Sequence, residues 1–335
     1  MSDYLLEISD LRIVFPSLEH TVQAVRGCNL SVAKGEVMGL VGESGSGKSM
    51  TALACLGLVP PPGRVTGSIR LDGHEVVGAS DADNRLLRGG VAAMIFQNPG
   101  KALNPFFTIG RQLTDAIATV RGVGHASAEK TAIEALSEVR IADPALAMHK
   151  YPHQVSGGQL QRAMIAMALA CQPKLLIADE PTTALDVTIQ AQVIVLLRDL
   201  ARLHGLTVLF ITHDLGVVGS LCDRLAVMYA GRVVESGSVD SLFANPAHPY
   251  TASLLRAVPM LGRGRGILTQ IPGTVPNMAA PPAGCAFHPR CPAAQPRCGS
   301  DDPAARENGR GRTIACHFPL SGPYSSVTDS KAAAS

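Results

Sequence analysis

The sequence contains no tryptophan, and aromatic residues make up only 4% of its 335 residues. It also lacks a long hydrophobic run: the longest, Ala163 to Cys171, covers nine residues, whereas a membrane-spanning helix needs about 20. No charged and then apolar leader opens the sequence, which gives no indication of export. We therefore expect a soluble, intracellular protein with an aliphatic α/β interior, long enough for more than one domain.

An excess of charge of one sign is missing as well. The sequence has 29 Lys and Arg against 27 Asp and Glu, which gives a formal net charge of +2. Proteins that bind nucleic acid usually carry a basic excess. We therefore expect no nucleic acid among the partners.

One glycine-rich segment joins a strand pattern to a helix pattern. The apolar run Val37–Val41 predicts a buried parallel strand, and Lys48–Leu56 predicts a helix. The eight residues that follow the strand match G-x-x-x-x-G-K-[ST]; they are Gly42, Glu43, Ser44, Gly45, Ser46, Gly47, Lys48 and Ser49. Such a loop binds phosphate with backbone N–H groups, its Lys reaches the β- and γ-phosphates, and its Ser hydroxyl binds Mg²⁺. The alternative is a glycine-rich turn without a ligand.

A second segment supplies the partner that a phosphate-binding loop needs. The apolar run Leu175–Ala178 predicts a strand that leads into Asp179 and Glu180. Asp179 would hold the Mg²⁺, and Glu180 would orient or deprotonate a water molecule. Together the two segments predict a site for ATP with Mg²⁺.

The rest of the sequence divides into segments with different secondary-structure patterns. Residues 5 to about 80 are rich in strand patterns, and about 109–170 have apolar residues at helical spacing. After Lys174, strand patterns alternate with a helix near Ile189–Leu203, which favours βαβ units and a parallel sheet. Ten of the 23 prolines lie between Pro259 and Pro319, so we expect an irregular segment held by something other than a core. Ser321–Ser335 has the composition of a disordered end.

Several short motifs together resemble those of ATP-binding-cassette (ABC) proteins. The residues Val155-Ser156-Gly157-Gly158-Gln159 resemble the family's signature loop. Gln97, Asp186 and His213 fall at its Q-loop, D-loop and switch-histidine positions, in the family's order. The resemblance implies an α/β P-loop NTPase fold of ABC type, with a RecA-like core, an antiparallel β subdomain, a helical subdomain and a Pro/Cys-rich C-terminal extension.

The same resemblance implies roles for individual residues. The signature loop (Ser156, Gly157, Gly158 and Gln159) would contact the ATP held by another protomer, so that two chains enclose two ATP molecules. Gln97 would touch Mg²⁺ or water and sense the docked channel. His213 would contact the γ-phosphate and help to hold the water and Glu180. Phe15 is the best match to the aromatic residue that stacks on adenine, although a core phenylalanine is the alternative interpretation.

Two further segments resemble dipeptide and oligopeptide importer ATPases. They are Asn98-Pro99 with Leu103 to Leu113, and Asn245 to Thr251. The resemblance implies an ABC nucleotide-binding domain over 1–258, with its helical subdomain at about 98–170. A peptide-importer extension would cover 259–320, and 321–335 would be a disordered tail.

The function implied is that of an ATP-hydrolysing subunit which powers the uptake of di- and oligopeptides. Its partners would be a second ABC ATPase subunit, similar but distinct, two membrane permease subunits and an extracytoplasmic substrate-binding protein. It would lie peripherally on the cytoplasmic face of the plasma (inner) membrane. Three alternatives remain: the same machinery importing nickel, a sugar or another solute, a soluble ABC ATPase without a transport role, and a regulatory ATPase whose output is set by its metal-binding tail.

Four of the eight cysteines crowd into the C-terminal part, with spacing Cys285-x5-Cys291-x6-Cys298-x17-Cys316. Disulfides are rare in cytosolic proteins, so a metal site is the stronger interpretation. Four thiolates suit either Zn²⁺ or a [4Fe–4S] cluster. The spacing resembles the cysteine tail of peptide-importer ATPases, which implies the [4Fe–4S] cluster. His288 and His317 keep a mixed Cys/His zinc site open, and unmetallated thiols are the third possibility.

Overall fold

The computed structural model describes residues 3–17, 19–183, 185–257, 271–309 and 311–321. The chain forms two compact units, each assembled from segments that are distant in sequence. The first unit comprises Met1–Leu5, Val32–Glu36 and Arg70–Ile211. The second comprises Leu6–Ser31, Val37–Ile69 and Thr212–Ser335. The phosphate-binding loop therefore belongs to the same unit as the cysteine-rich segment.

Three parallel strands form the sheet of the first unit, in the order β8-β7-β6. Their bounds are Ala92–Ile95 for β6, Leu175–Asp179 for β7 and Thr207–Thr212 for β8. All residues of β7 and β8 are buried, as expected for parallel strands that are covered on both faces. Helix α8 (Val187–His204) connects β7 to β8, which confirms the predicted βαβ unit.

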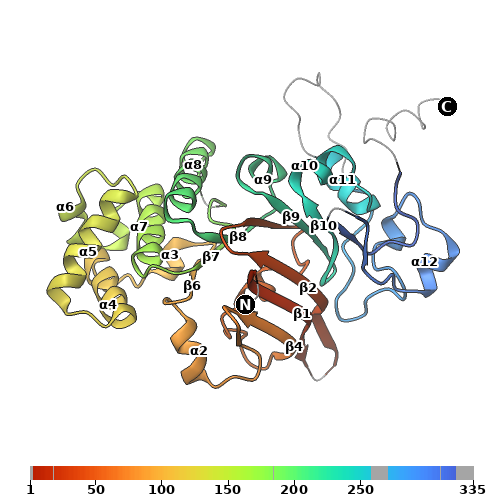
Figure 1. Cartoon of the computed structure of the whole chain (residues 1–335), viewed down its shortest axis with the longest axis horizontal. Coiled ribbons are helices and arrows are strands. Elements are labelled where there is room, and N and C mark those ends of the chain that lie inside the picture. The colour runs from red at the N-terminus through yellow and green to blue at the C-terminus, as the bar shows by residue number, and fades with distance from the viewer. Residues whose placement is uncertain (1–2, 18, 184, 258–270, 310, 322–335) are drawn as a thin grey trace. The chain divides into compact units, whose positions relative to one another are not determined.

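Helices make up most of the rest of the first unit (Figure 1). The main ones pack through buried aliphatic side chains such as Leu113, Leu136 and Ile165, and this confirms the helical pattern between 109 and 170. They are α4 (Ile109–Arg121), α5 (His125–Glu138), α6 (Pro144–Met148) and α7 (Gly157–Ala170), with the shorter α2 (Asp81–Leu87), α3 (Pro99–Ala102) and η1 (Pro152–Gln154).

The second unit contains strands from both ends of the chain. Strand β9 (Arg224–Tyr229) pairs in parallel with β3 (Val37–Val41) and antiparallel with β10 (Arg232–Ser238). The order continues through β12 (Thr313–Ile314) to β11 (Arg306–Glu307). A second sheet has the order β2-β1-β4, formed by β2 (Thr21–Ala33), β1 (Tyr4–Pro16) and β4 (Arg64–Leu71), and the end of β4 pairs antiparallel with β5 (His74–Glu75).

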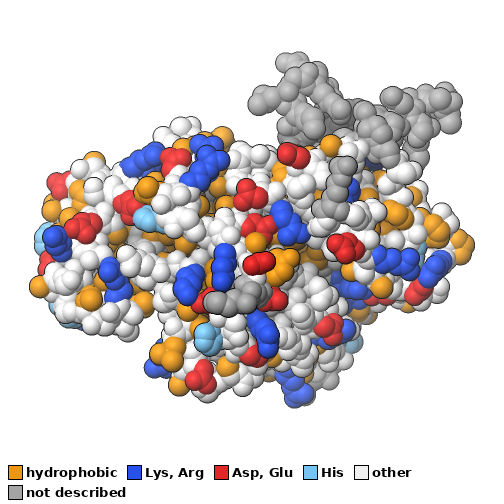
Figure 2. All heavy atoms as spheres, viewed as in Figure 1, with side chains coloured by type: hydrophobic (Ala, Val, Ile, Leu, Met, Phe, Trp, Pro, Cys, Tyr) orange, Lys and Arg blue, Asp and Glu red, His pale blue; other side chains and the backbone are white. Residues whose placement is uncertain are grey.

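Several short helices complete the second unit. The loop after β3 leads into α1 (Lys48–Ala54), and α9 (Leu215–Leu221) precedes β9. After β10 come α10 (Val239–Ala244) and α11 (Pro249–Ala257), and the C-terminal segment adds η2 (His288–Arg290) and α12 (Pro296–Ser300). On the face shown in Figure 2, acidic and basic side chains are interspersed over the described residues.

The expectation that the C-terminal segment is held by something other than a core is wrong. Phe287 is 1% exposed, and its ring centroid lies 5.2 Å from that of Tyr229 and 5.3 Å from that of Tyr250. One buried aromatic ring contributes a large apolar area, and β12 also extends the sheet. The predicted disordered end beyond Ser321 lies outside the described residues.

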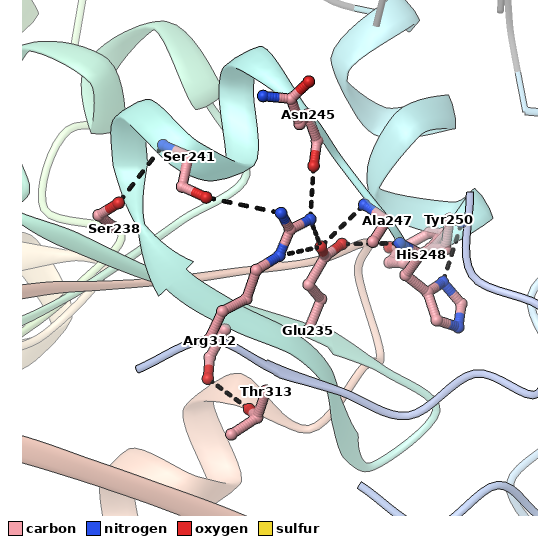
Figure 3. Close-up of polar contacts among 10 residues, drawn as sticks. Glu235, Ser238, Ser241, Asn245, Ala247, His248, Tyr250, Arg312 and Thr313 are labelled. Atoms are coloured by element: carbon pink, nitrogen blue, oxygen red, sulfur yellow. Dashed lines mark hydrogen bonds and ion pairs between the residues drawn. The ribbon is translucent and has the colours of Figure 1, made fainter. Parts of the chain in front are cut away.

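A buried ion pair also anchors this segment (Figure 3). The carboxylate of Glu235, in β10, is 0% exposed and is bound by the guanidinium of Arg312. It also accepts hydrogen bonds from the backbone N–H groups of Ala247 at 2.9 Å and His248 at 3.0 Å. A buried carboxylate needs such partners to offset its desolvation, so the loss of Arg312 would loosen the segment.

Candidate active site

The phosphate-binding loop has the backbone that its glycines require. Gly47 precedes α1 with φ of 103°, and a Cβ there would lie 2.6 Å from the carbonyl oxygen of Ala24. A Cβ on Gly42 would lie 2.1 Å from the carbonyl oxygen of Met228. Only glycine fits such close approaches. The predicted strand–loop–helix arrangement is therefore confirmed.

The side chain of Lys48 lies inside this loop. Lys48 is 5% exposed, and its Nζ donates hydrogen bonds to the carbonyl oxygens of Gly42 at 2.8 Å and Glu43 at 3.0 Å. A longer contact of 3.4 Å joins Nζ to Ser46 Oγ. Ser44, Gly45 and Ser49 are exposed. The loop thus surrounds a positive charge and leaves its tip open to solvent.

Glu43 ties the loop to the C-terminal half of the second unit. Its backbone N–H donates to the hydroxyl of Tyr250 at 2.9 Å. Its carboxylate pairs with both terminal nitrogens of Arg290, at 2.6 and 2.9 Å. Sequence analysis missed Tyr250 and Arg290, because nothing in the local pattern points to residues more than 200 positions away.

The first unit brings Gln97 and Glu180 together. They follow the carboxyl ends of the adjacent parallel strands β6 and β7, an edge where ligands bind in α/β sheets. The amide Nε2 of Gln97 donates to Glu180 Oε2 at 2.8 Å. Thr183 Oγ1, which sequence analysis did not single out, donates to the same oxygen at 2.9 Å. Asp179 is buried at the end of β7.

The backbone of Glu180 is held in an unusual conformation. Its φ is 44°, a region that residues other than glycine rarely adopt. Its N–H donates to the carbonyl oxygen of Ile211, at the end of β8, at 2.9 Å. Strained backbone persists where its surroundings hold it and is concentrated at functional sites.

The signature-loop residues begin a helix of the first unit. Ser156 caps α7: its hydroxyl accepts the N–H of Gln159 at 3.3 Å, and the Gln159 side chain accepts the N–H of Ser156 at 3.2 Å. Ser156, Gly157 and Gln159 are exposed. A Cβ on Gly158 would lie 2.8 Å from a methyl group of Ile189 in α8. Asp186 caps α8 through the N–H of Ile189.

The last two predicted nucleotide contacts lie in the second unit. His213 follows β8 directly and is exposed. Phe15 lies in β1 and is half-buried, and Gly63 approaches its ring so closely that a Cβ would lie 2.8 Å from it. Adenine stacking by Phe15 stays a prediction.

The four C-terminal cysteines line one cavity, together with His248, His288 and His317. None of the four is in a disulfide. Burial raises the pKa of the thiols of Cys285, Cys291 and Cys316, and that of Cys316 reaches about 11. The charges of the neighbouring cysteines raise these pKa values further. No group of three or more His, Cys, Asp or Glu side chains within the described residues is arranged to hold a metal ion.

His248 presents a buried donor in this cavity. Its Nδ1 accepts the backbone N–H of Tyr250 at 3.0 Å, so the proton of the neutral ring belongs on Nε2. Burial lowers the pKa of His248 to about 3, and Nε2 has no hydrogen-bond partner in the described part of the chain. An orphaned buried N–H is costly unless something accepts it.

Comparison with known proteins assigns the family. The chain matches the family described as "ABC transporter" over residues 25–183 and that described as "Oligopeptide/dipeptide transporter, C-terminal region" over residues 234–298. It is 49% identical to a probable peptide ABC transporter ATP-binding protein (y4tR) of Sinorhizobium fredii, over 94% of this chain and 95% of that protein. It is 46% identical to the dipeptide transport ATP-binding protein DppD of Escherichia coli, over 94% and 97%.

A solved structure agrees with these relatives. The dimeric ATP-binding cassette MJ0796, bound to ADP and Pi after hydrolysis, is 26% identical and superimposes with a TM-score of 0.61. The superposition covers 70% of this chain and 98% of the cassette. The P-loop fold of ABC type is thereby confirmed. Its motifs, its fold and these relatives show that this chain belongs to the ABC transporter family as an ATP-hydrolysing ATP-binding protein.

Proposed function

We propose that this chain is the ATP-hydrolysing subunit of an importer that takes up di- or oligopeptides. The observation that carries the proposal is the similarity to dipeptide and oligopeptide transport ATP-binding proteins, which extends over 94% or more of the chain. It includes the C-terminal region that the transporter family shares. Closure of an ATP-bound pair of such subunits would drive a separate membrane channel.

Residues of the two motifs would hold ATP with Mg²⁺. Lys48 would bind the β- and γ-phosphates, and the Ser49 hydroxyl with the Asp179 carboxylate would bind the metal. Gln97 suits a further contact: its Nε2 donates to Glu180, which leaves its amide oxygen for Mg²⁺ or water. These are oxygen donors, the ligands that Mg²⁺ prefers. Glu180 would then orient the attacking water, and His213 would hold it from the γ-phosphate side.

The exposed signature loop supports a site shared between two chains. The N-terminus of α7 suits an anion, because its first N–H groups and its dipole favour negative charge. The solved cassette is dimeric with its products bound. We place a second, similar but distinct ATPase chain opposite this one. Two permeases and an extracytoplasmic binding protein would complete the complex at the cytoplasmic face of the membrane.

No helix among the described residues is long and apolar enough to cross a bilayer. In our proposal, the permease subunits provide the membrane channel.

The assembled complex provides the test. We expect this chain alone to hydrolyse ATP slowly, because a partner must supply the second signature loop. When this chain is co-expressed with its permeases and partner ATPase and the purified complex is reconstituted in lipid vesicles, its ATPase activity should rise on addition of a peptide-loaded binding protein. Phosphate release is the measurement, with nickel and sugars as control solutes. Full turnover by a monomer would contradict the shared site, and stimulation by a control solute alone would exclude peptide as the cargo.

For the four cysteines we propose a [4Fe–4S] cluster, with zinc as the rival. The proposal is supported by their common cavity and by the unpartnered Nε2–H of His248 in it, since cluster sulfurs accept hydrogen bonds. The raised thiol pKa values mean that a metal would have to displace the thiol protons when it binds. When bound, the cluster would join the segments that carry Cys285, Cys298 and Cys316.

Iron analysis tests this proposal. Protein purified without oxygen should be brown and contain about four irons and four acid-labile sulfides per chain. Replacing Cys298 by Ser should lower the iron content, because one ligand is lost. Cys171→Ser is the matched control, since Cys171 lies outside the tail and should leave iron unchanged. Colourless protein with one zinc would decide for the rival metal, and metal-free protein with four titratable tail thiols would exclude both.

A further inference from the structure

Arg290 places a buried positive charge from the C-terminal segment against the phosphate-binding loop. Its side chain is 5% exposed, and Glu43, its partner in the loop, is 24% exposed. The guanidinium meets the carboxylate with two nitrogens, at 2.6 and 2.9 Å. Paired, shielded contacts of this kind are the strong class of ion pair.

All the donors of Arg290 are used. Besides Glu43, its nitrogens donate to the hydroxyl of Tyr229 at 3.3 Å and to the carbonyl oxygens of Pro272 at 3.0 Å and Ile271 at 3.4 Å. A guanidinium has five N–H groups in a rigid fork, and each has an acceptor here. Lysine, with three donors and no fork, cannot reproduce this arrangement. The site is therefore built for arginine.

Glu43 is held at each of its polar groups. Tyr250 binds its N–H, Arg290 binds its carboxylate, and Lys48 donates to its carbonyl oxygen. The position of Glu43 thus bears directly on the position of the Lys48 ammonium. An unpaired carboxylate at Glu43 would also repel the phosphates of ATP.

We propose that Arg290 is a positioning residue of the ATP site, which makes nucleotide affinity depend on the ion pair between Arg290 of the C-terminal segment and Glu43 of the loop. Arg290 neutralises Glu43 and fixes the loop without touching the nucleotide. Arg290 directly precedes Cys291. A change in the conformation of the cysteine segment would therefore move Arg290 and, through its ion pair with Glu43, the phosphate-binding loop. The inference goes beyond the proposed transport function and does not depend on the identity of the cargo or the metal.

A double-mutant cycle on the full-length chain tests the proposal, with the dissociation constant of MgATP measured by calorimetry. We expect Arg290→Met to weaken binding about tenfold, because one uncompensated charge then faces the phosphates. Glu43→Gln alone leaves the positive charge of Arg290 without its counter-charge, so it should tighten MgATP binding and not weaken it. The double variant should recover most of the lost affinity, because the unpaired carboxylate is gone.

Arg312→Met is the matched control. Arg312 also anchors the C-terminal segment through a buried carboxylate, that of Glu235, but no described contact joins it to the loop. Both Met variants should lower the melting temperature, and only Arg290→Met should weaken MgATP binding. If Arg290→Met does not fold, Arg290→Lys and Arg312→Lys are compared in the same way. Unchanged affinity at position 290, equal losses at both positions, or no recovery in the double variant would each overturn the proposal.

Discussion

Replacing Glu180 by Gln is expected to lower ATP turnover by roughly 10²–10⁴-fold while ATP binding stays intact. The amide keeps the shape of the carboxylate, and its oxygen can still accept from Gln97 and Thr183, which now bind Glu180 Oε2 at 2.8 and 2.9 Å. What is lost is the negative charge that, in our proposal, orients and deprotonates water. Single-turnover hydrolysis and nucleotide affinity of the assembled complex are the measurements.

Thr183→Val is the matched control for this experiment. It removes one hydrogen bond to the carboxylate but keeps its charge, so we expect a much smaller loss of turnover. Near-normal activity of the complex with Glu180→Gln would remove Glu180 from the catalytic role. A loss of ATP binding in the same variant would assign Glu180 to the binding of ATP rather than to hydrolysis.

The strands and the loop of the nucleotide motifs could be predicted from the sequence, because their signals are local. Buried parallel strands are short continuous apolar runs, so β3 and β7 were recognisable within a residue of their ends. The turn after β3 follows from glycines that no other residue can replace there. Motif positions singled out Gln97 and Glu180 as site residues, but the hydrogen bond between their side chains was not predicted.

The docking of the C-terminal segment could not be predicted, because its contacts are non-local. Arg290 meets Glu43 across 247 positions, and Arg312 meets Glu235 across 77. Proline-rich composition indicated an irregular segment but gave no sign that Phe287 enters an aromatic core. The predicted boundary between residues 258 and 259 stays a prediction, since 258–270 lie outside the described residues.

The role of His248 at the cysteine cavity also could not be predicted from the sequence. The spacing of the four cysteines indicated a metal site, whereas His248 lies 37 positions before Cys285 in a motif that resembled only the family extension. Its buried, unpartnered Nε2 is visible only once the chain is folded. A buried polar group without a partner therefore supports a ligand site that the sequence had only suggested.

Replacing Lys48 by Ala is expected to weaken ATP binding and to lower hydrolysis by at least roughly 10²–10³-fold. The ammonium lies within the loop and binds the carbonyl oxygens of Gly42 and Glu43. Its loss removes these contacts and also the charge that, in our proposal, faces the phosphates. Affinity for MgATP and phosphate release by the assembled complex are the measurements.

Lys130→Ala serves as the control for Lys48→Ala, because Lys130 is an exposed residue of α5 and the same charge is removed away from the site. It should leave both quantities unchanged. Lys48→Arg should not restore hydrolysis, since the bulkier planar guanidinium does not fit a position that is 5% exposed. Wild-type turnover with Lys48→Ala would show that the phosphates are bound without this charge, and the loop would then contribute only its backbone N–H groups and the dipole of α1.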